Sequence, residues 1–137
     1  MSRVIVSGGS IEEIAQKVTE GIREQLPSRA YRGANELRNS ALTVLSGSGS
    51  GRKYGKHRAS APGEPPAVRS GAFRLSWKPR TYAFGTSYFS IIDSYVWYAY
   101  WLENGTPGGQ MAPRPHHERI QMDALPRIIA IYDAPYF

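Results

Sequence analysis

The residues of this chain best suited to chemistry are its three histidines, His57, His116 and His117, with Glu118 directly after the last of them. A metal site needs at least two such side chains to converge with a carboxylate. Adjacent residues on an α-helix point about 100° apart, which places His116 and His117 poorly for sharing one ion. We therefore expect solvated histidines near a helix start, with no metal site and no cofactor.

The remaining carboxylates give little support for acid–base catalysis. Glu12 and Glu13 lie where the first turn of a helix is expected, and the helix dipole accounts for acidic residues there. Glu103 stands alone among aromatic residues, which is typical of a buried or rim carboxylate paired with an arginine. The chain has no cysteine, so thiolate catalysis, disulfides and zinc fingers are excluded. The sequence therefore predicts a protein that is not an enzyme.

Most of the positive charge lies in one segment, residues 46–72. The chain carries a net charge of +6, and this segment contributes +4 of it through five Lys or Arg and one Glu. It also contains six Gly, five Ser and three Pro, and Val68 is its one large aliphatic residue. Such a composition buries too little apolar surface to offset the entropy of ordering. We expect a basic flexible arm that binds a partner through Arg52, Lys53, Lys56, Arg58, Pro62, Pro65 and Pro66.

Residues 10–45 have the pattern of an amphipathic helix. Ser10 and Glu13 have the S-x-x-E spacing of a capping box, which predicts the helix start. Apolar residues follow at helical spacing, and Pro27 interrupts the pattern. We expect one kinked helix or two consecutive helices. The apolar residues are Ile11, Ile14, Ala15, Val18 and Ile22 before the proline, and Ala30, Ala34, Leu37, Ala41 and Leu45 after it.

The second half of the chain predicts strands and two shorter helices. Residues 73–93 mix β-branched, aromatic and polar residues, and the cluster Gly85–Ser87 predicts a turn between two strands. Residues 96–104 predict a short helix, because Gly105 follows where a left-handed C-terminal cap belongs. Residues 116–131 predict a last helix with a kink at Pro126 and with Ile120, Leu125 and Ile128 facing inward.

Together these elements predict a single domain of the α+β class, in which an N-terminal helix or kinked helix pair and a C-terminal helix pack on a small, mostly antiparallel sheet. Residues 4–6 add a possible short edge strand. Ten of the 16 aromatic residues lie between Trp77 and Trp101, so this region is expected to supply most of the core or an interface. The longest apolar or aromatic run has eight residues, far below the roughly 20 that span a bilayer, and predicts no contact with a membrane.

Two stretches, residues 57–77 and 98–120, resemble the small neck or tail-completion proteins of long-tailed bacteriophages. In that family an APGEPP run, here 61–66, leads to an SG-x-hydrophobic-R-x-S start of a strand, here 70–76. An aromatic-Ala-aromatic run follows, then E-x-GT, and then an M-x-PRP turn before the last helix. The matching residues here are Tyr98 to Tyr100, Glu103 to Thr106 and Met111 to Pro115, while His116 replaces a commoner Phe.

The resemblance implies a structural virion protein without catalytic activity, which forms a homo-oligomeric ring on the portal axis at the head–tail junction. Its partners would be the adjacent portal-side connector and tail-side proteins, after assembly in the host cytoplasm. The arm would lie across one neighbour. Inter-subunit or structural roles would fall to Tyr98, Tyr100, Trp101, Glu103, Gly105, Thr106, Arg114 and Pro115.

Two other functions are compatible with the sequence. A small basic monomer would bind nucleic acid with the arm of residues 46–72 as a clamp, and a ring protein would also have non-specific contact with DNA in its channel. A metal-dependent nuclease built on the histidines and Glu118 is the third interpretation. DNA affinity that depends strongly on salt distinguishes the clamp from a protein whose assembly depends on concentration.

Overall fold

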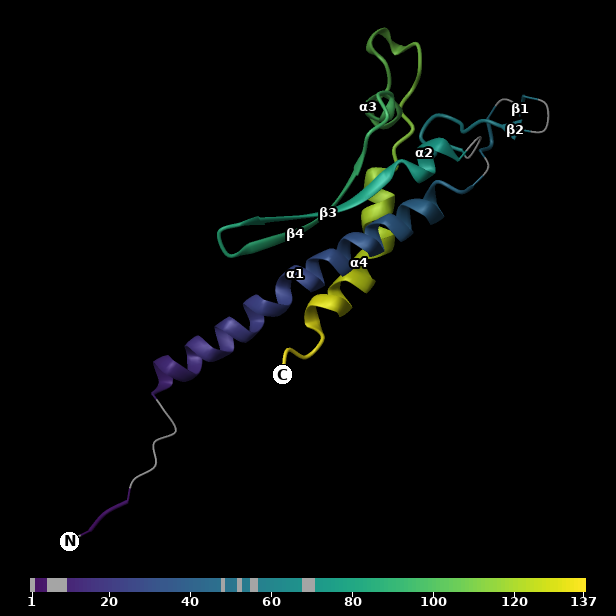
Figure 1. The fold of residues 1–137 in the computed structure, drawn as a ribbon. Coiled ribbons are helices and arrows are strands. Elements are labelled where there is room, and N and C mark those ends of the chain that lie inside the picture. The colour runs from purple at the N-terminus through teal and green to yellow at the C-terminus, as the bar shows by residue number, and fades with distance from the viewer. Residues whose placement is uncertain (1, 5–9, 48, 52, 55–56, 68–70) are drawn as a thin grey trace.

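The computed structural model describes residues 2–4, 10–47, 49–51, 53–54, 57–67 and 71–137. Two long helices dominate the fold, and a β-hairpin packs against the first of them (Figure 1). The expected α+β class is therefore confirmed. The elements in chain order are α1 (Ile11–Val44), β1 (Lys53–Tyr54), β2 (His57–Arg58), α2 (Ala72–Leu75), β3 (Trp77–Phe84), β4 (Ser87–Ser94), α3 (Ala99–Asn104), the 3₁₀ turn η1 (Pro107–Gly109) and α4 (His117–Asp133).

Helix α1 is a single helix of 34 residues rather than a pair. The predicted capping box is present: the Ser10 hydroxyl accepts a hydrogen bond from the Glu13 amide at 3.1 Å, and the Glu13 carboxylate accepts one from the Ser10 amide. Pro27 lies inside the helix, although it cannot donate a backbone hydrogen bond. The buried residues of the helix all lie on the C-terminal side of this proline, from Arg29 to Ala41.

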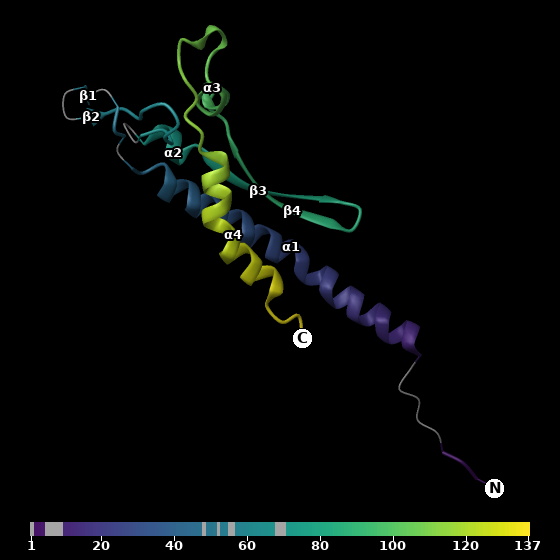
Figure 2. The same cartoon turned by 180° about the vertical axis from the view of Figure 1, so that it is seen from behind.

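The contacts of α1 are concentrated on its C-terminal part, where α4, β3 and β4 pack. The N-terminal turns extend away from the rest of the molecule, as both views show (Figures 1 and 2). The core is small and consists of Ala41, Leu45, Trp77 and Ile120, with Leu37, Val44, Phe73 and Ile92 packed against it. Ala30, Ala34 and Ala124 are also fully buried. Small side chains therefore let the helices approach each other closely.

Arg29 ties the C-terminal tail to the middle of α1. Its guanidinium donates hydrogen bonds to the carbonyls of residues 131, 132, 134 and 135, and it lies 3.5 Å from the centre of the Tyr136 ring. These carbonyls include the last ones of α4, which have no partner within the helix. The side chain is almost fully buried. Arg29 thus caps α4 from a neighbouring helix, a role that no local sequence pattern indicates.

Strands β3 and β4 form the predicted hairpin, with Trp77 opposite Ser94 and Phe84 opposite Ser87. The turn between them contains Gly85 at a φ of +60°, where glycine is favoured. The strand does not start at the SG-x-hydrophobic-R-x-S motif as expected, because residues 72–75 form the helical turn α2 and β3 begins at Trp77. The turn places Phe73 against the core residues.

Two expectations concern the core, and the first of them, that Leu125 faces inward, is wrong. Leu125 on α4 is 40% exposed, and the inward positions of that helix are held by Ile120, Ala124 and the half-buried Ile128. Of the ten aromatic residues from Trp77 to Trp101, only Trp77 is buried. The aromatic region therefore supplies surface rather than most of the core, and the other expected role, an interface, stays a prediction.

Residues 46–72 do not extend as a free arm over their described part. Strands β1 and β2 pair with each other, and the Gly51 amide bonds to the Ala59 carbonyl at 2.8 Å. The Glu64 carboxylate accepts hydrogen bonds from the amides of Ser50 and Ala61, each at 3.0 Å, and from the Ser50 hydroxyl. These bonds lower the Glu64 pKa to about 2. Mobility of this segment in the free subunit stays a prediction.

The predicted edge strand at residues 4–6 lies mostly outside the described residues. Within the described part of the chain, no helix combines the length and the apolar character needed to cross a membrane.

Candidate functional site

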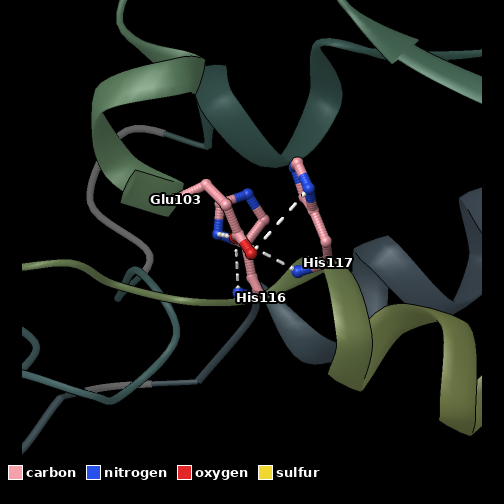
Figure 3. A group of neighbouring side chains, drawn as sticks. All are labelled: Glu103, His116 and His117. Carbon is pink, nitrogen blue, oxygen red and sulfur yellow. Dashed lines mark hydrogen bonds and ion pairs between the residues drawn. The ribbon is translucent and has the colours of Figure 1, made fainter. Parts of the chain in front are cut away.

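A cluster of Glu103, His116 and His117 lies where α3 ends and α4 begins (Figure 3). One Glu103 carboxylate oxygen accepts hydrogen bonds from the backbone amides of His116, at 2.8 Å, and His117, at 3.2 Å. The residue at the N-cap position, His116, makes no capping bond with its own side chain. Glu103 therefore caps α4 from a different helix, and its negative charge is stabilised by the helix dipole.

His116 is completely buried and packs edge-on against the rings of Phe73 and Trp77. Its Nδ1 lies 2.8 Å from the Arg114 carbonyl oxygen and 3.0 Å from a Glu103 oxygen. Both neighbouring oxygens can only accept a hydrogen bond, so Nδ1 carries the proton and donates it to the Arg114 carbonyl. Its Nε2 has no hydrogen-bond partner among the described residues. Burial lowers the pKa of the imidazole, which favours its neutral form.

His117 completes the cluster from the first turn of α4. Its Nδ1 lies 3.8 Å from the second Glu103 oxygen, and its side chain is 57% exposed. One candidate ligand atom from each of the three residues lies within 4.8 Å of the other two. Figure 3 shows both imidazoles close to the carboxylate, and the His116 ring overlaps the Glu103 side chain in this view.

The geometric reason for expecting no metal here does not apply. His116 has φ −146°, outside the helical region, so the two histidines are not separated by a helical rotation. The carboxylate that meets them is Glu103, from another element, and not the exposed Glu118. Sequence reasoning missed this convergence because residues 103 and 116 are brought together by the loop between them.

That loop is built by residues of the E-x-GT and M-x-PRP motifs. Gly105 has φ +80°, as its predicted capping role requires, although its ψ of 166° is extended rather than left-handed helical. A Cβ atom there would lie 2.9 Å from the Met111 carbonyl oxygen. The Thr106 hydroxyl accepts a hydrogen bond from the Met111 amide at 2.8 Å.

Arg114 holds the same loop in place. Its backbone amide donates a hydrogen bond to the Leu102 carbonyl, and its guanidinium donates one to the Ser60 hydroxyl, which ties the loop to the basic segment. The half-buried Pro115 then leads directly into the cluster.

The aromatic residues around α3 form an exposed surface. Tyr95, Trp97 and Tyr100 are 74%, 82% and 64% exposed, whereas Tyr98 and Trp101 are half-buried. Tyr98 contacts the core residue Phe73, with ring centres 5.9 Å apart. We name Tyr95, Trp97 and Tyr100 the aromatic surface.

A second apolar surface lies on the N-terminal turns of α1. Ile11, Ile14 and Val18 are 83%, 51% and 42% exposed and lie on one side of the helix at its 3.6-residue spacing. We name these three residues the α1 stripe. Their spacing predicts the helix correctly, but the packing that amphipathic spacing normally signals is absent from the described chain.

The predicted arm residues are divided between exposed and half-buried positions. Lys53 and Arg58 are exposed, and Arg58 donates a hydrogen bond to the Gly51 carbonyl. Pro62 is exposed as well, whereas Pro65 and Pro66 are half-buried and line a shallow cleft together with Glu64 and Arg119. The other two, Arg52 and Lys56, lie outside the described residues.

Comparisons of this chain with protein-family models, with curated proteins and with solved structures found no match.

Proposed function

We propose that this chain is a non-enzymatic structural protein of the phage neck, which forms a ring at the head–tail junction and joins the tail to the portal-side connector. The observation that carries the proposal is the exposed α1 stripe on a projecting helix. The family resemblance of the sequence supplies the biological setting.

The distribution of side-chain sizes along α1 supports assembly. The part of α1 that packs within the chain buries small residues, among them Ala30, Ala34 and Ala41. The large aliphatic residues of the α1 stripe remain in solvent. Burying such a side chain fully contributes about 1.5–3 kcal/mol, so a partner that covers the stripe gains substantial free energy. A second copy of the chain is the partner that a homo-oligomer supplies.

A ring needs two different surfaces that fit each other, because its interface is heterologous. The α1 stripe and the aromatic surface meet this need, since the start of α1 and helix α3 lie at opposite ends of the molecule in both views (Figures 1 and 2). Contact of the α1 stripe of one copy with the aromatic surface of the next would propagate around a closed ring. Aromatic residues are also enriched at the buried centres of protein interfaces.

The basic segment is proposed to contact the adjacent portal-side or tail-side ring. Lys53 and Arg58 are exposed there, and the run of residues 61–66 offers prolines on the same segment. A preformed extended proline-rich segment suits docking on a protein, whereas phosphate binding has no need of it.

Head-to-tail joining in cells tests the proposal. The double variant Ile14→Asp, Val18→Asp places two charges on the α1 stripe, and we expect heads and tails to accumulate without joining. The matched control, Gln16→Asp with Thr19→Asp, adds the same charge at exposed positions outside the stripe and should support joining. Normal joining with the stripe variant would contradict the proposal.

Replacement of Arg52, Lys53, Lys56 and Arg58 by Ser separates this function from nucleic-acid binding. The proposal predicts loss of joining and negligible DNA affinity of the unmodified protein. Tight binding of DNA by a monomer that weakens steeply with salt and is lost in the variant would favour the clamp function instead.

A further inference from the structure

We propose that Glu103, His116 and His117 bind a zinc-class divalent cation where α3 meets α4. Two imidazoles and one carboxylate form a ligand set in which Zn²⁺ is held by three protein groups, with water in the fourth position. The candidate ligand atoms lie within 4.8 Å of one another. Ligands of a tetrahedral zinc ion at bond lengths of about 2.0–2.2 Å stand closer than this. Because the 3.0 Å contact between His116 and Glu103 is made by Nδ1, the Glu103 carboxylate and the exposed His117 have to turn toward Nε2 of His116 to close around an ion.

The buried histidine is the observation that points to a ligand. His116 is fully enclosed, yet its Nε2 has no hydrogen-bond partner among the described residues. An unpartnered polar atom in the interior is unfavourable unless something outside the protein satisfies it. The Arg114 carbonyl faces the other ring nitrogen, Nδ1, at 2.8 Å. Metal-bound histidines commonly make this kind of backbone contact, which fixes the orientation of the ring.

The charge and the exposure of the other two residues also suit a cation. Glu103 brings one negative charge, and its side chain is only 17% exposed. Among the described residues, no Lys or Arg is paired with it, so a cation would not have to displace one. The exposed His117 provides the way in from solvent and can turn toward the ion without disturbing the core.

Imidazole nitrogen favours Zn²⁺ and its neighbours in the first transition row, whereas Mg²⁺ prefers an all-oxygen shell. A bound ion would connect the end of α3 directly to the start of α4, across the loop that carries Gly105 and Arg114. The role that follows is a cross-link that makes the loop rigid, and it does not depend on the proposed function.

Calorimetric titration of the metal-free full chain with Zn²⁺ alone tests the site. We expect one ion per chain, a raised Tm and no binding of Mg²⁺. His117→Gln should weaken Zn²⁺ binding by at least about tenfold, because it removes a ligand at an exposed position where folding is tolerant. Glu103→Gln should weaken it as well, while its amide oxygen still accepts the two backbone hydrogen bonds. The matched control is His57→Gln, which changes the third histidine and should leave the affinity unchanged.

Substitution of Co²⁺ for Zn²⁺ gives a second readout, since a four-coordinate site produces intense visible absorption. We expect this absorption in the unmodified chain and in His57→Gln, and its loss in His117→Gln. Absence of Zn²⁺ binding in the unmodified chain would overturn the proposal. So would binding that survives both His117→Gln and Glu103→Gln, or binding that His57→Gln abolishes.

Discussion

The two halves of α1 have the same apolar spacing and opposite surroundings. From Arg29 to its end the helix is covered by α4 and the β3–β4 hairpin, whereas the α1 stripe of Ile11, Ile14 and Val18 is in solvent. Apart from Arg29, the covered half buries small residues, namely alanine, glycine and serine, and the uncovered half exposes isoleucine and valine. Periodicity therefore identifies a helix and its apolar face, but it does not say whether the cover comes from the same chain.

The largest expected effect is on the covered half. Arg29→Ala leaves the carbonyls of residues 131–135 without their donor and removes the contact with Tyr136. We expect a loss of about 2–4 kcal/mol in the free energy of unfolding, because buried polar groups lose charge-assisted hydrogen bonds. Urea denaturation followed by circular dichroism measures it. The exposed Arg23→Ala in the same helix should change stability by less than about 0.5 kcal/mol, and an equal loss in both variants would contradict this account.

The next largest effect comes from overpacking of the core rather than from lost hydrogen bonds. Ala34 is fully buried, so Ala34→Leu inserts volume between closely packed elements and should cost about 1–3 kcal/mol. Ala15→Leu makes the same change on the exposed half and should leave the unfolding free energy of the monomer almost unchanged. Chemical denaturation of the two variants side by side checks the contrast. A destabilised Ala15→Leu monomer would mean that the first turns of α1 are packed after all.

The smallest effect lies in the segment that follows the covered end of α1. The Glu64 carboxylate bonds to Ser50 and Ala61, and its pKa falls from an ordinary 4.5 to about 2. The folded state favours the ionised carboxylate. The stability that its hydrogen bonds give to this segment is therefore present above pH 4.5 and is lost as the pH falls from there toward 2. We expect hydrogen exchange at the Ser50 and Ala61 amides to lose protection over this range. In Glu64→Gln the protection should be weaker at neutral pH and independent of pH between 4.5 and 2, apart from the intrinsic exchange rate.

Local patterns predicted the elements whose determinants lie within a few residues. Ser10 and Glu13 cap α1 as their spacing indicates, and Gly85 and Gly105 occupy backbone with positive φ. The same patterns failed where packing between distant segments decides. Leu125 has the spacing of an inward residue, but α4 turns Ala124 toward α1 instead.

The sequence drew attention to the residues of the candidate site one at a time, but it did not predict that they lie together. Glu103 was expected to be a carboxylate paired with an arginine, and it caps α4 beside two histidines instead. Its role depends on a loop that brings positions 103 and 116 together, and no spacing within either segment contains that information. Gly105 and Thr106 were singled out by the family resemblance, and their contacts with the Met111 backbone explain why such residues fit this loop.

The absolute mass of the protein in solution tests the central claim, that a second copy covers the α1 stripe. Light scattering over a series of concentrations should give 15.2 kDa at high dilution and a multiple of this mass as the concentration rises. The Ile14→Asp, Val18→Asp variant should stay at 15.2 kDa throughout, with the circular dichroism spectrum of the unmodified chain. An unmodified chain that remains a monomer at every concentration, or a variant that assembles as well as it does, would contradict the account.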